Sequence, residues 1–324
     1  MSELKPNPSL PKGMSAPEVA NLTLSGEPRF ASHQVSDQQQ EVGELLSQPP
    51  VVKRPDTLGL SDNPESPEDI DVIVENNQKM FTALGLINPD TNQPYDLNQE
   101  YTQGNILFPS QEQQESAKQL GHTQALIIPG NIPTSTIKDL FETGKYKQEF
   151  QSDVIYLSDQ AKTDWQNTTS AKSEQLTQQN QSNPSPTRPN QLYLIYTKPD
   201  ILVQDAHPET AGLSAKDCQD ILTQHQQENP ELNLKGLTLK EYCLLDALTF
   251  TLSQKHLEGL HPDSNIYQWS WLLEETVIDP ITNQPVRCLC ALWDPVTRRL
   301  GVGSDRLAFS SSFSGARFAA VPVF

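Results

Sequence analysis

The side chains best suited to covalent chemistry are four cysteines, Cys218, Cys243, Cys288 and Cys290. A thiol acts as a nucleophile or a zinc ligand when its surroundings stabilise the thiolate. The chain has no C-x-x-C pair, so its cysteines lack the spacing of common zinc sites. Cys288 and Cys290 are two residues apart on an expected strand and would share one face. We therefore predict buried, reduced thiols. A catalytic cysteine, supported only by Arg287 beside Cys288, is the alternative.

Histidine is the other residue type that could catalyse or bind metal. His256 and His261 flank a loop, with Asp263 nearby. Two histidines and an acid can hold a metal ion, and a solvated polar loop has the same composition. The sequence contains no G-x-x-x-x-G-K-[ST], G-x-G-x-x-G, G-x-S-x-G or H-E-x-x-H motif. We therefore predict no catalytic residue, no metal site and no cofactor.

The segment from Arg298 to Phe318 combines arginine, serine, glycine and phenylalanine. Adaptable binding loops use small polar residues and exposed aromatic rings in this way. The segment therefore indicates a binding surface. The alternative is that Phe309 and Phe313 anchor an irregular loop to the core.

The charge of the chain excludes two classes of partner. The formal net charge is -18, which opposes general binding to nucleic acid or to an anionic membrane surface. The stretch 287–324 differs, because it holds five arginines and two aspartates and no lysine or glutamate, a local charge of +3. No apolar run approaches the roughly 18 residues that span a bilayer. The start of the chain has no apolar signal segment, so we expect a cytoplasmic protein without membrane insertion.

Three regions should position these residues. Residues 1–66 hold nine of the 26 prolines and little apolar periodicity, which predicts a disordered, acidic tail. Residues 67–230 should form a small α/β region. Its expected helices are 67–84, 110–121, 134–150 and one after Ser214, and its expected strands are 125–128, 154–157 and 192–196. We predict a disordered insertion at 158–190, which is rich in Gln, Ser, Thr, Asn and Pro.

Residues 231–324 should form a separate C-terminal domain. Thr238 and Glu241 form a capping box, which predicts a helix running to about His256. Alternating runs and turns then predict several short antiparallel strands. The chain closes on an apolar strand, 317–324, which Pro322 should place at a sheet edge. The fold class predicted for the chain is therefore α+β.

The pattern of one helix, Trp269-Ser270-Trp271, Cys290-Ala291-Leu292-Trp293 and Phe313-Ser314-Gly315-Ala316-Arg317 resembles a known family. It is similar to the C-type-lectin-fold variable proteins of diversity-generating retroelements, or to a related bacterial family that ends in a Gly-Ala-Arg strand, over roughly the last 90 residues. The resemblance implies a ligand-binding scaffold in which Trp269 and Trp271 are core and residues 315–317 open the last strand. It also implies that the ligand-facing residues lie between Trp293 and Ser314. The contact candidates are Trp293, Asp294, Arg298, Arg299, Ser304, Asp305, Arg306, Phe309 and Ser311.

These observations favour a non-enzymatic module that binds a protein ligand. Two alternatives stay open. One is a structural or interaction protein of a mobile element or assembly. The other is an enzyme related to the formylglycine-generating enzymes, which share the general architecture of the lectin-like fold.

Overall fold

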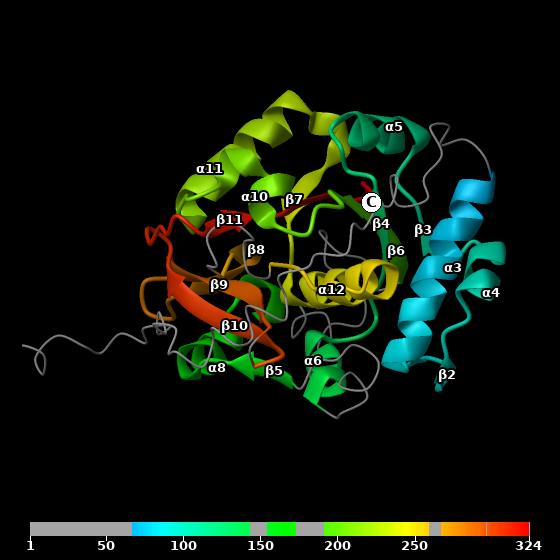
Figure 1. Ribbon diagram of the computed structural model, residues 1–324, viewed down its shortest axis with the longest axis horizontal. Coiled ribbons are helices and arrows are strands. Elements are labelled where there is room, and N and C mark those ends of the chain that lie inside the picture. Colours follow the sequence, from blue (N-terminus) through cyan, green and yellow to red (C-terminus); the bar gives the residue numbers. More distant parts are fainter. Residues whose placement is uncertain (1–66, 143–153, 173–190, 259–266, 296, 324) are drawn as a thin grey trace, which may run out of the picture. The chain divides into compact units, whose positions relative to one another are not determined.

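The computed structural model describes residues 67–142, 154–172, 191–258, 267–295 and 297–323, all within one compact unit, Asp56–Phe324. Within these residues the chain is a mixed α and β structure with two five-stranded sheets (Figure 1). The disordered tail predicted for residues 1–66 lies outside the described residues, and so do His261 and Asp263.

The first sheet, called sheet I, has the strand order β11-β8-β9-β10-β5. Its strands are β8 (Trp269–Ile278), β9 (Pro285–Asp294), β10 (Arg299–Arg306), β11 (Ser314–Ala316) and β5 (Val154–Leu157). β8, β9 and β10 are antiparallel neighbours, with Ser270 opposite Ala291 and Ala291 opposite Val302. β11 and β5 pair in parallel with β8 and β10. The sheet is therefore mixed, and two of its strands are longer than the short antiparallel strands expected from the sequence.

The second sheet, called sheet II, is built around a fully buried strand. Its strands are β3 (Ile106–Leu107), β4 (Gln124–Pro129), β6 (Leu192–Thr197), β7 (Leu234–Gly236) and β12 (Phe318–Ala320). Every residue of β6 is buried, and β6 pairs with β3, β4 and β12. β12 lies between β6 and β7, so the closing strand is interior and not at the edge that was expected. Pro322 lacks an N–H but lies beyond the end of β12, so it removes no hydrogen bond from the sheet.

The helices begin where polar side chains accept backbone N–H groups. The capping box at Thr238 is present as predicted, a second one at Ser110 begins the helix expected at 110–121, and Ser214 caps the helix that follows it. The helices are α3 (Pro67–Leu84), α4 (Leu97–Thr102), α5 (Gln111–Gln119), α6 (Thr134–Glu142), α8 (Asp159–Trp165), α10 (Val203–Ala206), α11 (Ala215–Glu228) and α12 (Leu239–Ser253). Two 3-10 turns, η1 (Pro208–Thr210) and η2 (Pro230–Leu232), and a small hairpin of β1 (Ile87–Asn88) and β2 (Gln93–Pro94) complete the described elements.

Helix α12 lies between the two sheets. It contacts β8 of sheet I, β4 of sheet II and the helices α3 and α6 (Figure 1). All twelve residues from Leu239 to Phe250 are buried. A helix that is covered on every side has no solvent-facing stripe, so its charged residues must find partners inside the protein.

The two sheets cross the domain boundary that was expected at residue 231. β5, from the predicted α/β region, pairs with β10, and β6 from the same region pairs with β12. One hydrophobic core runs from Ile73 to Val321. Short-range patterns cannot show such pairings, because each strand has the same local signature whichever sheet it joins.

The predicted disordered insertion at 158–190 is ordered in its first part. Ser158 caps α8, and Ala161 and Asp164 are buried against sheet I. Thr169 then donates a hydrogen bond to the carbonyl of Glu274 at 2.5 Å. The segment was predicted to be disordered because its composition is mostly polar. A helix can nevertheless pack against a sheet when only one of its faces is apolar. Residues 173–190 lie outside the described part of the chain.

Candidate functional site

The four cysteines are reduced and buried, as predicted. Burial in apolar surroundings raises the pKa of Cys218 to about 12 and the pKa values of Cys243 and Cys288 well above their ordinary value. A thiol that stays protonated and inaccessible is a poor nucleophile. The cysteines therefore act as small hydrophobic side chains of the core.

His256 forms a buried pair with Asp246 of α12. Its Nδ1 lies 2.9 Å from one carboxylate oxygen, and the other oxygen accepts the backbone N–H of Leu257 at 2.7 Å. The imidazole is stacked between Phe250 and Trp293, with ring centroids 4.5 and 3.6 Å away. Both ring faces are therefore covered, and the pair fixes the chain that leaves α12. Among the described residues, no cluster of His, Cys, Asp and Glu could hold a metal ion.

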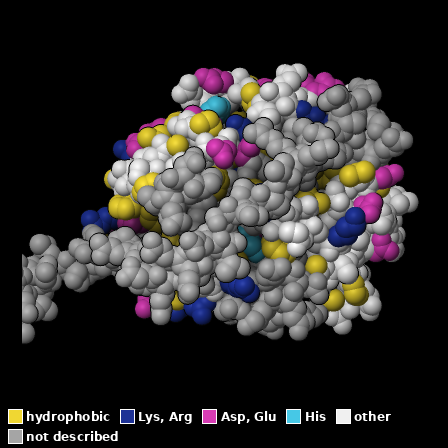
Figure 2. All heavy atoms as spheres, in the orientation of Figure 1, with side chains coloured by type: hydrophobic (Ala, Val, Ile, Leu, Met, Phe, Trp, Pro, Cys, Tyr) yellow, Lys and Arg dark blue, Asp and Glu magenta, His cyan; other side chains and the backbone are white. Residues whose placement is uncertain are grey.

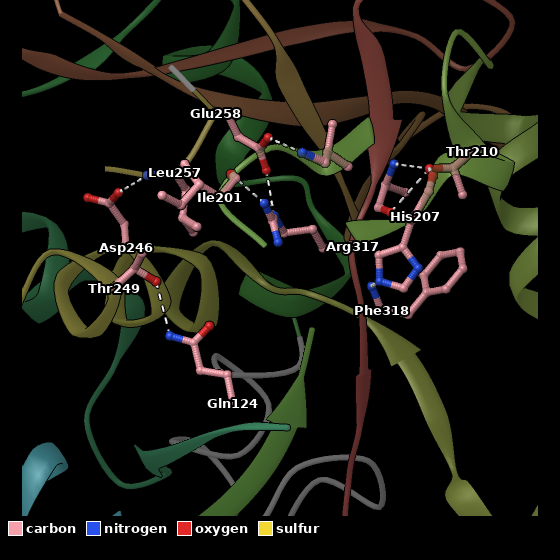
Figure 3. Close-up of polar contacts among 12 residues, drawn as sticks. Gln124, Ile201, His207, Thr210, Asp246, Thr249, Leu257, Glu258, Arg317 and Phe318 are labelled. Carbon is pink, nitrogen blue, oxygen red and sulfur yellow. Dashed lines mark hydrogen bonds and ion pairs between the residues drawn. The ribbon is translucent and has the colours of Figure 1, made fainter. Parts of the chain in front are cut away.

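A second buried pair joins Glu258 to Arg317 of the Gly-Ala-Arg motif (Figure 3). Arg317 donates to Glu258 at 2.5 Å and to the carbonyl of Ile201 at 2.6 Å. The other carboxylate oxygen of Glu258 accepts the N–H of Val203 at 2.7 Å. Burial raises the pKa of Glu258, and the nearby Arg317 opposes that rise. The motif arginine thus has a structural partner inside the protein.

His207 links η1 to the last strand. Its Nε2 accepts the N–H of Phe318 at 3.2 Å, so its Nδ1 carries the proton and faces Glu209 at 3.1 Å. Figure 3 shows His207 beside Phe318. Burial lowers the pKa of His207 to about 4 and that of the neighbouring His122 to about 3. Burial acts to raise the pKa of Glu209, but the hydrogen bond from His207, a backbone hydrogen bond and the charges of His207 and Lys198 together outweigh it, and the pKa falls to about 2. The two histidines are therefore neutral structural groups.

The predicted contact residues do not form one surface. Asp294, Arg298 and Arg299 belong to the turn between β9 and β10, whereas Asp305 and Arg306 end β10. The eight residues of β10 separate Arg299 from Arg306 by roughly 23 Å, at about 3.3 Å per residue.

Two of the predicted contacts are inside the protein. Trp293 is 7% exposed and covers His256. Ser304 is 5% exposed, donates to Asp164 of α8 at 2.6 Å and accepts from Arg287 at 3.1 Å. Alternation along a strand cannot tell a solvent-facing side from one that a helix covers, so the sequence did not reveal their burial.

The connection from β10 to β11 does present exposed side chains. Phe309 is 40% exposed, and its ring meets the half-buried Trp269 edge-to-face at 6.0 Å. The backbone of Leu307 bonds to Val286, which is 38% exposed, and to Lys216 of α11. Arg306 and Lys216 are exposed beside these apolar groups. In Figure 2, hydrophobic side chains gather at the left of the drawn face, where Figure 1 shows β11 and the connection that precedes it. We call Arg306, Phe309 and Lys216 the Phe309 surface.

Comparison of the chain with protein-family models, with curated proteins and with solved structures finds no match. Among the described residues, none of the helices has the length and apolar character needed to cross a membrane. The site therefore has to be interpreted from its own geometry.

Proposed function

We propose that this protein is a non-enzymatic binding module that engages another protein through the Phe309 surface. The observation that carries the proposal is the exposure of Phe309 on a connection whose backbone is fixed to Val286 of β9 and to Lys216 of α11. A rigidly held, exposed aromatic ring loses little conformational entropy when a partner covers it.

The chemistry of the surface suggests the chemistry of the partner. Phe309 offers apolar contact, and Arg306 and Lys216 add positive charge at its border. A complementary surface would insert an apolar side chain and place carboxylates around it. The overall charge of the protein is strongly negative, but the attraction between the partner's carboxylates and the basic side chains is local to this surface. An acidic partner is therefore compatible with the charge of the chain.

The likeness to C-type-lectin-fold variable proteins is part of the same proposal. In that likeness, the segment between Trp293 and Ser314 faces the ligand. Of its candidates, Arg306, Phe309 and Ser311 belong to the strand end and connection proposed here, and Asp294, Arg298 and Arg299 form the separate turn at the other end of β10.

The proposal is tested by site-specific crosslinking followed by affinity measurement. A photoreactive phenylalanine at position 309 of the full chain should capture a protein from cells, and the same group at position 299 should not. The captured protein is then purified, and its affinity for variants is measured.

Phe309→Ser and Arg306→Glu should each weaken the measured affinity by about tenfold or more, as the loss of an anchor residue does. Arg299→Glu is the matched control, because it reverses an exposed arginine at the far end of β10 and should leave the affinity unchanged. Equal loss for Arg299→Glu and Arg306→Glu would show general charge attraction and would contradict the proposed surface.

A further inference from the structure

One row of residues crosses sheet I from β8 to β5 on a single face. Gly301 of β10 pairs with Leu292 of β9 on one side and with Tyr156 of β5 on the other. The register of β8 with β9 brings Trp269 opposite Leu292. Paired residues on neighbouring strands point to the same face of a sheet. These four residues, Trp269, Leu292, Gly301 and Tyr156, are called the sheet I row.

The sheet I row lies on the face that solvent reaches. Tyr156 is 49% exposed, and Trp269, Leu292 and Gly301 are half-buried. A Cβ built on Gly301 would have the Leu292 side chain as its nearest neighbour, 3.8 Å away, so there is open space above the glycine. The aromatic residues at the ends of the row are three strand spacings apart, or about 14 Å. The row therefore offers two aromatic ends separated by a low, apolar middle.

A polar row runs beside the sheet I row on the same face. Asp294 pairs with Arg299, and each is two residues from a member of the sheet I row on its own strand. Tyr267, two residues before Trp269, donates from its hydroxyl to Asp294 at 3.0 Å. Arg299 is exposed and makes no ion pair with the residues that the structure describes. Its guanidinium group is therefore open to an anionic group of a ligand.

The two rows together fit a molecule that has an apolar face and a polar edge. The face of an aromatic ring carries a negative quadrupole, and the polarised C–H groups on the face of a sugar ring pack against it. The hydroxyls at the edge of the same sugar both donate and accept hydrogen bonds, as Tyr267 and Asp294 do. Arg299 adds a planar fork of donors that matches a carboxylate. The distance between the aromatic ends exceeds one sugar ring, which favours an oligosaccharide.

Single-stranded nucleic acid also stacks on aromatic side chains, but its phosphates require several cations along the strand. The polar row supplies Arg299 next to Asp294, and the turn before β10 adds Arg298. The chain as a whole carries a formal charge of -18. This balance of charges suits a ligand with a few carboxylates better than a polyphosphate.

From this arrangement we infer that the exposed face of sheet I binds an acidic oligosaccharide. Its sugar rings stack on Tyr156 and Trp269 across the gap at Gly301, and Arg299 binds one of its carboxylates. The inference does not rest on the proposed protein partner, because the Phe309 surface shares none of these residues.

The probes are tetragalacturonate, which is carboxylated, and maltotetraose, which is neutral. Their binding to the full chain is followed by calorimetry and by ligand-observed saturation-transfer NMR. Tetragalacturonate should bind saturably, with the strongest transfer to its C–H protons. Its affinity should exceed that of maltotetraose by about fivefold, because only the acidic probe pairs with Arg299.

Two exposed positions test the two rows. Tyr156→Ser should weaken the binding of tetragalacturonate by about tenfold, because it removes one stacking ring. Ile281→Ser, at a side chain that is 91% exposed in the turn between β8 and β9, is the matched control and should keep the affinity. Arg299→Gln should abolish the preference for the acidic probe. Arg306→Gln at the other end of β10 should keep that preference although it lies in the Phe309 surface, so either proposal can fail without the other.

The absence of saturable binding of tetragalacturonate to the wild-type chain would overturn the inference. Equal affinities in wild type, Tyr156→Ser and Arg299→Gln would place the sugar elsewhere and would also overturn it. Equal affinities of the wild-type chain for the two probes would contradict the pairing of Arg299 with a carboxylate. If decathymidylate binds more tightly than tetragalacturonate and is weakened by the same two variants, the ligand is a single-stranded nucleic acid and the assignment to a saccharide is wrong.

Discussion

Two neighbouring stretches of the chain, 306–312 and 314–318, differ in what their side chains meet. In 306–312, Arg306 and Phe309 face solvent, although the backbone is hydrogen-bonded to β9 and α11. In 314–318, every residue is buried, and Gly315, Arg317 and Phe318 each have a specific partner. A run of Ser, Gly, Phe and Arg can therefore serve as surface or as core. The deciding factor is whether another element lies against it.

Arg317→Met should have the largest effect, because it leaves Glu258 buried without its counter-charge. We expect the free energy of unfolding to fall by about 3–5 kcal/mol, measured by urea denaturation. The double variant Glu258→Gln with Arg317→Met removes both charges and should lose less than the sum of the single changes. A loss below about 1 kcal/mol for Arg317→Met would show that the buried pair is not needed for stability.

Low pH should lower the stability of the protein through His207, which contacts Phe318 in the stretch 314–318. The folded state depresses the pKa of His207 to about 4, so the unfolded chain binds its proton first as the pH falls. The histidine's contribution is present above its ordinary pKa and is lost as the pH falls from about 6.5 towards 4, by roughly 2–3 kcal/mol. His122 adds a loss that begins at the same ordinary pKa of 6.5 and continues to about pH 3, and Glu209 adds one between about pH 4.5 and 2.

The measurement for His207 is the unfolding free energy as a function of pH. His207→Gln keeps an acceptor for the Phe318 N–H and removes the titration, so its stability should vary less between pH 6.5 and 4. An unchanged slope in that variant would assign the acid response to other groups.

Gly315→Ala should have an intermediate effect. The new methyl group would lie 3.0 Å from the Thr210 hydroxyl and 3.1 Å from a methyl of Val203. Both distances are shorter than ordinary van der Waals contacts, so the neighbouring side chains would have to move. We expect a loss of about 1–3 kcal/mol in chemical denaturation. Gly301→Ala on β10 is the matched control, because its nearest neighbours are 3.8 Å away and it should be close to neutral. Equal effects at both positions would contradict the packing difference.

Phe309→Ser should have the smallest effect on stability. The ring is 40% exposed, so we expect a change within about 0.5 kcal/mol. The same variant should lose affinity for the captured partner. A loss of stability comparable with that of Gly315→Ala would make Phe309 a core anchor, the alternative that its sequence context left open.

The local elements could be predicted, and their partners could not. The capping boxes at Ser110 and Thr238 and the strands β4, β5 and β6 follow from short-range patterns, and the structure has them. The pairing of β5 with β10 depends on contacts about 145 residues apart, which no local pattern encodes. The ordered α8 was missed because its polar exposed face dominates its composition.

The candidate contact residues could also be predicted only in part. The Arg298–Phe318 segment was recognisable as unusual, and Arg306 and Phe309 are exposed as a binding surface requires. Trp293 and Ser304 could not be recognised as buried, because their partners His256 and Asp164 are distant in sequence.

The position of β12 has a consequence for synthesis of the protein. β12 fills the gap between β6 and β7, more than 80 residues after β7 has left the ribosome. Until residues 318–320 emerge, β6 and β7 expose unpaired backbone edges that could pair with other nascent chains. Sheet II can therefore close only after residues 318–320 have been synthesised, and β6 and β7 need protection from mispairing during this interval.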